Sequence, residues 1–224
     1  MTTDEKHAAK VGRQHTIYKI ADGTRVPGTT TITGVMDKPA LVRWANGLGL
    51  KGIDSSKYVD EMAKIGTLAH AIVEAYIKGE KMDYSDATPN QISLAENAAL
   101  KFFEWLKGHK VDWLGSEKIL ISEKYRFGGT IDAYCVLDGK RTLLDFKTCK
   151  GIYSEHKTQV GGGYKILCEE NALPVEQVTI LRIGRDEGEG FDIVPVDNCD
   201  IHQERFLVCR KLYDLNRLCN ERQW

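Results

Sequence analysis

Two aspartates and one lysine stand near the middle of the chain, at Asp132, Asp145 and Lys147. The stretch that holds them, residues 128–147, consists of two apolar runs on either side of an Asp-Gly pair at 138–139. Asp-Gly between apolar runs predicts a β-hairpin, because both turn positions need a positive φ angle. Paired strands would carry the two aspartates side by side. The spacing of Asp145-x-Lys147 also predicts that these two side chains point to one face.

Carboxylates that point into one place repel each other unless a cation joins them. A hard divalent metal ion is the usual cation at such a site, and a lysine beside it can hold a phosphate or an activated water. These residue types therefore predict metal-assisted hydrolysis of a phosphodiester. The plainer alternative is a pair of solvated strand carboxylates that Lys147 neutralises. Because Asp132 follows an apolar run and Asp145 ends one, we favour the metal site.

The same residues, taken with two further motifs, resemble a known family. Asp132 followed by Asp145-x-Lys147 resembles the core of the PD-(D/E)XK nuclease superfamily, and the surrounding residues are most similar to its RecB-like exonuclease branch. The resemblance covers residues 30–167, about two thirds of the chain. The motifs are Gly66-Thr-Leu-Ala-His70-Ala-Ile-Val-Glu74, Gly129-Thr-Ile-Asp132, Leu144-Asp-Phe-Lys-Thr148 and Gln159 with Tyr164.

This resemblance implies a restriction-endonuclease-like α/β fold, with a mixed central β-sheet and flanking helices. It implies that Asp132 and Asp145 bind one or two Mg²⁺ or Mn²⁺ ions, and that His70 and the backbone carbonyl of Phe146 complete the coordination shell. It implies that Lys147 positions or deprotonates the attacking water, or stabilises the charge that develops on the phosphate.

His70 and Glu74 lie in a stretch with helical periodicity, Val59–Lys78, at the edge of its apolar stripe. Being four residues apart, they lie side by side on the helix. By itself, this pattern indicates a partly buried histidine next to a glutamate. With the other motifs we favour His70 as a metal ligand. Glu74 is either a supporting group behind the ligands or a surface partner of Lys78.

The segment 155–170 reads as a helix interrupted by three glycines, at 161–163. The family pattern separates Gln and Tyr by four residues, whereas Gln159 and Tyr164 are five apart, about 140° out of alignment on a regular α-helix. A local bulge within the glycines would restore the alignment. The glycines predict close approach, either of a DNA backbone or of the sheet. Gln159, Tyr164, Lys150 and Lys157 are the predicted substrate contacts.

Periodicity and turn signals predict the remaining elements. Trp44 is expected in the core, and Glu123 is expected to face solvent rather than the site. The C-terminal helix is expected to turn Ile201, Val208, Leu212, Leu215 and Cys219 inward. The predicted elements are a hairpin over 16–26, helices over 40–48, 90–107 and 199–219, and strands over 117–126, 130–137, 141–147, 177–183 and 191–196.

The chain has 224 residues and a formal net charge of −1. This length predicts a single nuclease domain over 15–224, with its catalytic core at about 60–170, after a mobile tail at 1–14. The region 118–165 holds nine Lys or Arg and five Asp or Glu. Positive charge therefore gathers around the predicted site, where nucleic acid binding needs a local patch.

The six cysteines form no C-x-x-C pair and follow no secretory signal, which predicts reduced thiols. Cys199, Cys209 and Cys219 are ten apart and share no helix face, so we expect small buried hydrophobes. No cysteine precedes Cys135, so we expect no iron–sulfur cluster of the kind some RecB-like nucleases carry. No apolar run has membrane-spanning length. The expected location is the cytoplasm of a bacterium or a phage-infected host.

The favoured function is a metal-dependent DNA exonuclease in recombination, repair or phage DNA processing. An endonuclease of the same fold is the first alternative, and a module that binds nucleic acid without cutting is the second. The expected partners are DNA and a recombination or single-strand-binding protein. The sequence does not show the polarity of cleavage, whether the substrate is DNA or RNA, or whether it is single- or double-stranded. It does not show the oligomeric state either.

Overall fold

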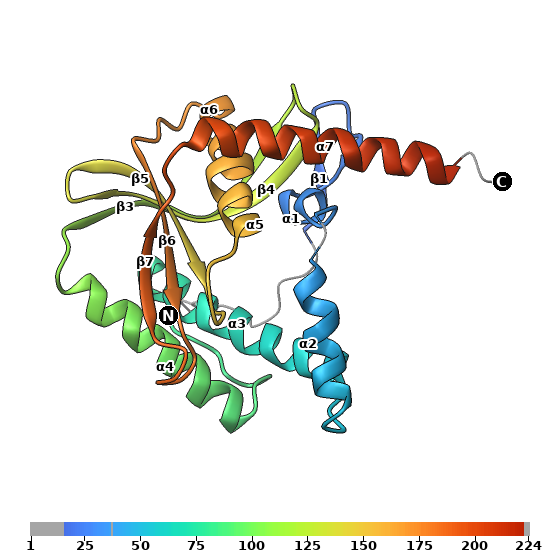
Figure 1. The fold of residues 1–224 in the computed structure, drawn as a ribbon. Helices are drawn as coiled ribbons and strands as arrows, with labels where there is room; N and C mark the ends of the chain where they lie inside the picture. The colour runs from blue at the N-terminus through green and yellow to red at the C-terminus, as the bar shows by residue number, and fades with distance from the viewer. Residues whose placement is uncertain (1–15, 37, 222–224) are drawn as a thin grey trace, which may run out of the picture.

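In a computed structural model that describes residues 16–36 and 38–221, the chain is built around one five-stranded β-sheet (Figure 1). Its strand order is β3-β4-β5-β6-β7. All neighbours are antiparallel except β5 and β6, so the sheet is mixed. The strands are β3 (Val111–Ser122), β4 (Phe127–Leu137), β5 (Lys140–Lys147), β6 (Gln177–Ile183) and β7 (Phe191–Pro195).

The predicted Asp-Gly hairpin joins β4 to β5, and both turn residues have positive φ, 50° at Asp138 and 87° at Gly139. A parallel pair needs a crossover, which here consists of three consecutive helical segments between β5 and β6. They are α5 (Ser154–Lys157), the π-helix η1 (Thr158–Tyr164) and α6 (Lys165–Glu170). Strand β3 begins at Val111, six residues before the predicted start, because residues before Glu117 also pair with β4.

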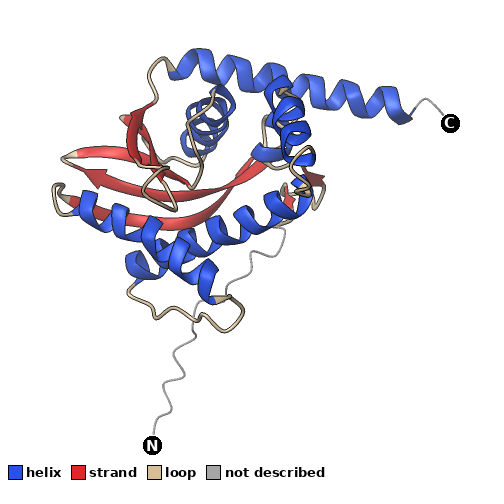
Figure 2. Ribbon diagram, turned by 60° about the horizontal axis from the view of Figure 1, so that its bottom comes forward, coloured by secondary structure: helices blue, strands red, loops and turns tan. Residues whose placement is uncertain are grey.

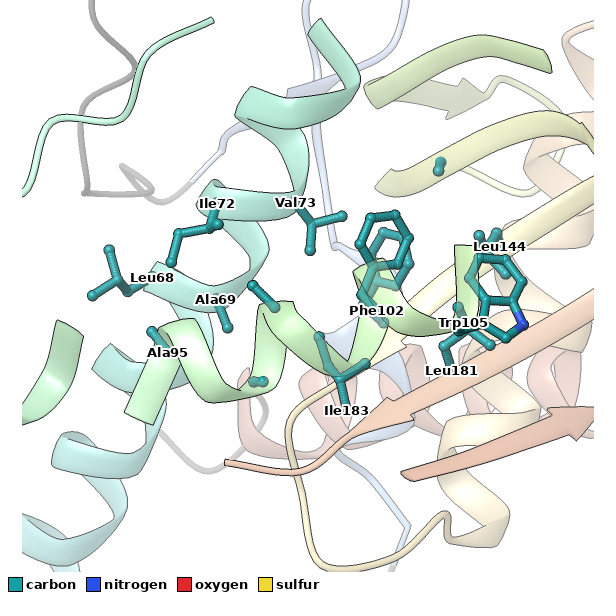
Figure 3. Packing of buried hydrophobic residues seen from close by; sticks show 14 of the residues in the cluster. Leu68, Ala69, Ile72, Val73, Ala95, Phe102, Trp105, Leu144, Leu181 and Ile183 are labelled. Carbon is teal, nitrogen blue, oxygen red and sulfur yellow. The ribbon is translucent and has the colours of Figure 1, made fainter. Parts of the chain in front are cut away.

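One face of the sheet is covered by α3 (Ser55–Lys78) and α4 (Pro89–Leu106). The Asp54 side chain caps the start of α3, and a capping box of Thr88 and Gln91 starts α4. Their apolar stripes meet the strands in a continuous core, in which Phe102 is fully buried (Figure 3). The same core includes Leu68, Ala69, Ile72, Val73, Ala95, Trp105, Leu144, Leu181 and Ile183.

The other face is covered by α1 (Thr29–Thr33), η1, α6 and the long helix α7 (Cys199–Glu221). Figure 2 shows the strands as one layer with helices on both sides. This is the α/β fold with a mixed central sheet that the sequence predicts, and it is consistent with a restriction-endonuclease-like core. The remaining elements are a small hairpin of β1 (Tyr18–Lys19) and β2 (Arg25–Val26) and the helix α2 (Pro39–Gly49).

The three glycines of η1 allow α7 to approach closely. A Cβ atom at Gly161 would lie 2.6 Å from Val196, one at Gly162 would meet the carbonyl oxygen of His202, and one at Gly163 would lie 2.7 Å from Phe206. The predicted close approach is therefore real. The neighbour of Gly162 and Gly163 is the C-terminal helix, whereas Gly161 meets Val196, which lies between β7 and α7 and is hydrogen-bonded to β6.

The predicted inward face of α7 is wrong. Phe206 and Cys209 are the buried side chains of this helix, whereas Ile201, Val208, Leu212, Leu215 and Cys219 are exposed. The buried row is offset by two residues, about 200° around the helix axis. The reason is that the recess over the glycines admits Phe206, and the packing of this one ring fixes the rotation of the helix.

Three other expectations have different outcomes. Trp44 is not in the core, because α2 buries none of its residues. The predicted tail, residues 1–14, lies outside the described residues, and the division into one domain stays a prediction. Within the described part of the chain, no helix is both long and apolar enough to cross a bilayer.

The glycine contacts predict opposite effects of alanine at two helical positions. Gly162→Ala is expected to lower the free energy of unfolding by roughly 1–3 kcal/mol, because its Cβ would collide with the backbone of α7. Gly47→Ala, in α2 with no atom within 4 Å of the new Cβ, is expected to raise it by roughly 0.5–1 kcal/mol. Urea unfolding measures both. Equal midpoints for the two variants would contradict the close-packing assignment.

Candidate active site

The strands β3, β4 and β5 bring three acidic residues to one level of the sheet. The last registered pair of β4 and β5 is Ala133 with Leu144, and the next position in that register puts Asp132 opposite Asp145. On the other side of β4, Ser116 pairs with Ala133 and Lys118 with Ile131, so Glu117 lies opposite Asp132. Three carboxylates therefore stand on adjacent strands.

Asp145 and Lys147 form an ion pair, with 2.7 Å between Oδ2 and Nζ. This contact confirms that the two side chains point to one face. Asp145 is 1% exposed, and apart from this ion pair neither of its carboxylate oxygens has a hydrogen-bond partner among the described residues. Burial raises the pKa of Asp145 to about 6; the Lys147 ammonium opposes this rise, and the Asp132 carboxylate adds to it.

Asp132 is held from two sides. Its Oδ2 atom accepts a hydrogen bond from the backbone N–H of Phe146 at 2.9 Å, and its Oδ1 atom lies 3.5 Å from Nδ1 of His70. His70 reaches the site from α3, and its ring meets the edge of the Phe146 ring at 6.0 Å between centroids. The predicted pair of strand carboxylates and a helix histidine is therefore assembled in space.

The backbone of Phe146 faces the same site. The register of β4 and β5 ends just before Asp132, so the N–H of Phe146 bonds to the Asp132 side chain instead of to the β4 backbone. In an extended strand the N–H and C=O of one residue point to the same edge. The Phe146 carbonyl is therefore directed toward the acidic group, as a metal ligand at this position requires.

Glu117 belongs to this group, although sequence reasoning used it only as a strand boundary. Ligand atoms of Glu117, Asp132 and His70 all lie within 4.8 Å of one another. Glu117 has φ of 48°, a conformation that non-glycine residues rarely adopt and that collects at functional sites. The signal that would have found Glu117 is the register of β3 with β4, which the sequence does not state.

This donor set suits a hard divalent cation. Carboxylate oxygens with one imidazole are ligands of Mg²⁺ and Mn²⁺, and buried carboxylate oxygens without hydrogen bonds need a cation to compensate for lost hydration. Asp145 meets this condition, because its oxygens are desolvated and have only Lys147 as a partner. His70, Glu117 and Asp132 therefore have the spacing of a metal site. Asp145 is not part of this close group, and its role as a ligand, like that of the Phe146 carbonyl, stays a prediction.

A glycine lets α3 deliver His70. A Cβ atom at Gly66 would lie 2.5 Å from Oγ1 of Thr148, the residue directly after β5. Because His70 is four residues after Gly66, it stands one turn further along the same side of the helix. The Gly-Thr-x-x-His motif thus has a packing reason, since only glycine permits this separation between helix and strand.

Glu74 and Glu123 each have a partner outside the acidic group. Glu74 makes an ion pair with Lys78, which is the surface alternative that the sequence left open, and a supporting role for Glu74 stays a prediction. Glu123 accepts a hydrogen bond from the backbone N–H of Ala21 at 2.8 Å and is exposed. The expectation that Glu123 is not a site residue agrees with this contact.

The π-helix aligns Gln159 with Tyr164. The Gln159 Nε2 atom donates hydrogen bonds to the Tyr164 hydroxyl at 2.8 Å and to Oγ1 of Thr30 at 3.1 Å. A π-helix repeats at i to i+5, so residues five apart become neighbours, and the predicted bulge is confirmed. Both side chains are buried, and burial raises the pKa of Tyr164 although nearby Lys147 opposes this. Their contact with substrate stays a prediction.

The two remaining predicted substrate residues lie on the crossover between β5 and β6. Lys150 is exposed in the loop after β5, and Lys157 is half-buried at the end of α5. Lys150 lines a cavity, and His70, the predicted metal ligand, lines the same cavity.

Comparison with known proteins gives weak similarities. No family model matches the chain, and no curated protein matches it. Among solved structures, the crystal structure of SSO0001 is similar at 15% identity and a TM-score of 0.38, with 81% of this chain and 74% of that chain covered. An alkaline exonuclease (LHK-Exo) from Laribacter hongkongensis is similar at 11% identity and a TM-score of 0.33, with 69% and 84% covered. The functional argument therefore rests on the site residues.

His156 is a second residue near the site that sequence reasoning missed. Its Nδ1 atom accepts a hydrogen bond from the backbone N–H of Tyr153 at 3.3 Å, which starts α5. Burial, with a further contribution from the Lys147 ammonium, lowers the pKa of His156 to about 4. His156 is therefore neutral at physiological pH and adds no positive charge beside Lys147.

The lowered pKa of His156 predicts a pH-dependent stability. An unfolded histidine has a pKa of about 6.5, so between pH 6.5 and 4 the unfolded chain binds a proton that the folded chain does not. As pH falls through this window, the wild type is therefore expected to lose roughly 1–3 kcal/mol more of its free energy of unfolding than His156→Gln loses. Urea unfolding at pH 7 and pH 4.5 measures it. A pH-independent difference would refute the assignment.

Proposed function

We propose that this chain is a metal-dependent deoxyribonuclease that hydrolyses phosphodiester bonds, and that it acts as an exonuclease. The observation that carries the proposal is the desolvated carboxylate of Asp145, paired with Lys147 and standing opposite Asp132. A protein that used these residues only for stability would gain more from apolar side chains, because buried ionic groups are expensive. The burial of these ionic residues at one place is best explained by a catalytic role.

Asp132, Asp145, His70, Glu117 and the Phe146 carbonyl would hold one or two Mg²⁺ or Mn²⁺ ions. When bound, such an ion neutralises the scissile phosphate and lowers the pKa of a water at the site. The hydrogen bond from Phe146 and the nearby His70 ring hold Asp132 in place before substrate arrives. Gln159 is hydrogen-bonded to Tyr164, and Tyr164 lies close enough to Lys147 for the ammonium to act on the pKa of the phenol.

Lys147 has one role that its environment favours. Burial lowers its pKa, but the Asp145 and Asp132 carboxylates more than offset this and raise the pKa above its ordinary value. The ammonium therefore keeps its proton at physiological pH. A protonated lysine stabilises negative charge that develops on the phosphate and orients the attacking water, but it does not remove a proton from that water.

The finer parts of the proposal follow from the motifs. The RecB-like resemblance supports an enzyme that works from free DNA ends in recombination, repair or phage DNA processing in the cytoplasm. Lys150 and Lys157 would contact the DNA backbone without reading sequence. A recombination or single-strand-binding protein is the partner that such a role would involve.

Asp145→Ala and Lys147→Ala are each expected to reduce DNA cleavage by at least about a hundredfold, because each removes a group that acts in the transition state. The assay is a time course on linear single-stranded, linear double-stranded and closed circular DNA, with Mg²⁺, Mn²⁺ or EDTA. Glu123→Gln, which removes an exposed glutamate just beyond β3, is the control that should retain activity. Loss of the circle would indicate an endonuclease. Wild-type rates in Asp145→Ala would refute the site, and binding without cleavage in the wild type would favour a non-cutting module.

Glu117→Gln is expected to weaken Mn²⁺ binding by at least about tenfold. Mutation of a residue that only supports a metal ligand typically costs this much affinity, and loss of a ligand itself should cost no less. Glu123→Gln is the matched control, because it removes an exposed glutamate just beyond the same strand. Isothermal titration calorimetry measures both without reference to cleavage. An unchanged dissociation constant in Glu117→Gln would exclude Glu117 from the metal site.

A further inference from the structure

A cavity of about 530 Å³ lies beside the candidate active site, between α2, α3 and the segment that follows β5. His70 lines it, so one predicted metal ligand forms part of its wall. Gly66 and Thr148, which set the approach of α3 to β5, line it too. The cavity is therefore continuous with the site and is formed by the same elements.

The walls of this cavity are aromatic and apolar. Trp44 from α2 and Tyr58 from α3 meet edge to face, with 5.8 Å between ring centroids, and Tyr153 adds a third ring from the crossover. Leu41 and Met62 also line the cavity. Trp44 is 36% exposed and Tyr153 is 53% exposed, so a large part of each of these two rings has no cover within the chain.

Two cationic side chains complete the lining. Lys150 lies on the segment after β5, and Arg185 lies after β6. Arg185 is held by Glu189, with 2.8 Å between Nε and Oε2, and both side chains are buried. Arg185 is therefore a fixed wall of the cavity, whereas Lys150 is exposed on the same lining.

We propose that this cavity holds an unpaired nucleobase of the strand that is cut, an inference that rests on the proposed function. A base is a flat aromatic ring attached to an anionic backbone, and aromatic walls with a cationic rim beside a phosphate-binding site match both parts. Base stacking on aromatic side chains tolerates any sequence. The cavity would thus grip the strand without reading it.

This placement defines the substrate class. A base in an intact duplex is stacked on both faces and paired at its edge, so it must leave the helix before it can enter a side cavity. A base in a single strand or a frayed end pays much less for this movement. The cavity therefore selects single-stranded DNA, or the unwound end of a duplex, over intact double-stranded DNA.

The test is binding of a fluorescently labelled single-stranded hexanucleotide, measured by anisotropy with Ca²⁺ replacing Mg²⁺. A gel checks that the oligonucleotide stays intact. A series of hexanucleotides carries one abasic residue at each position in turn, which removes a base and keeps every phosphate. Trp44→Ala is compared with Trp44→Phe, which keeps a ring, and with Leu50→Ala, which removes an exposed apolar side chain outside the cavity.

Trp44→Ala is expected to weaken binding by roughly tenfold, and one abasic position should weaken wild-type binding by a similar factor. The two losses should not multiply, because both remove the same contact. Trp44→Phe and Leu50→Ala should bind nearly as the wild type does. Multiplying losses, or equal binding by all variants, would overturn the inference and leave an apolar side chain of a protein partner as the other occupant.

The outcome is independent of cleavage. Binding is measured without cleavage, so the losses from Trp44→Ala and from the abasic position can fail to multiply even in a protein that cuts no DNA. That result would contradict the proposed nuclease function and leave the base-binding cavity supported. Cleavage that depends on Asp145 with no effect of Trp44→Ala on binding would defeat the cavity assignment alone. If Trp44→Ala does not fold, Tyr153→Leu removes a second ring, 53% exposed, from another element and answers the same question.

Discussion

The structure depends on the burial of negative charge at the ends of the central strands. Asp145 is almost completely desolvated, Asp132 stands opposite it, and Glu117 follows on the next strand. Burial raises the pKa of Asp145 because it removes water from the carboxylate, and the nearby charge of Asp132 raises this pKa further. Lys147 compensates for one of these charges through its ion pair. A divalent cation at the proposed site would compensate for the others, and its binding would then be coupled to the stability of the fold.

The helices on the two faces of the sheet position this site by different means. On the α3 face a large apolar core fixes the helix, and Gly66 lets it come close enough to Thr148 for His70 to reach Asp132. On the other face the π-helix widens one turn, which brings Gln159 and Tyr164 together behind Lys147. The irregular elements are therefore found next to the candidate site, and π-helical turns and strained residues such as Glu117 often occur at functional sites.

The helix α2 differs from both of these layers, since it buries none of its residues and carries several exposed apolar side chains. Exposed apolar surfaces of this kind often mark places that a ligand or partner covers. Its position over the cavity that includes His70 gives the exposed surface a reason. The proposed base-binding rings thus come from two kinds of element, because Trp44 lies on this exposed helix and Tyr58 lies on α3, which also carries His70.

The sequence by itself determined the sheet hairpin, the α/β class and the contact between Asp145 and Lys147, because these follow from periodicity, local spacing and turn chemistry. The bulge between Gln159 and Tyr164 was expected from the resemblance, because the family pattern separates the two residues by four positions. Only the tertiary structure decided which face of α7 is buried and that Glu117 joins the site, since both depend on contacts between distant segments. Phe206 entering the glycine recess overrode the apolar pattern of α7. The register of β3 against β4, which no local signal encodes, placed Glu117 opposite Asp132.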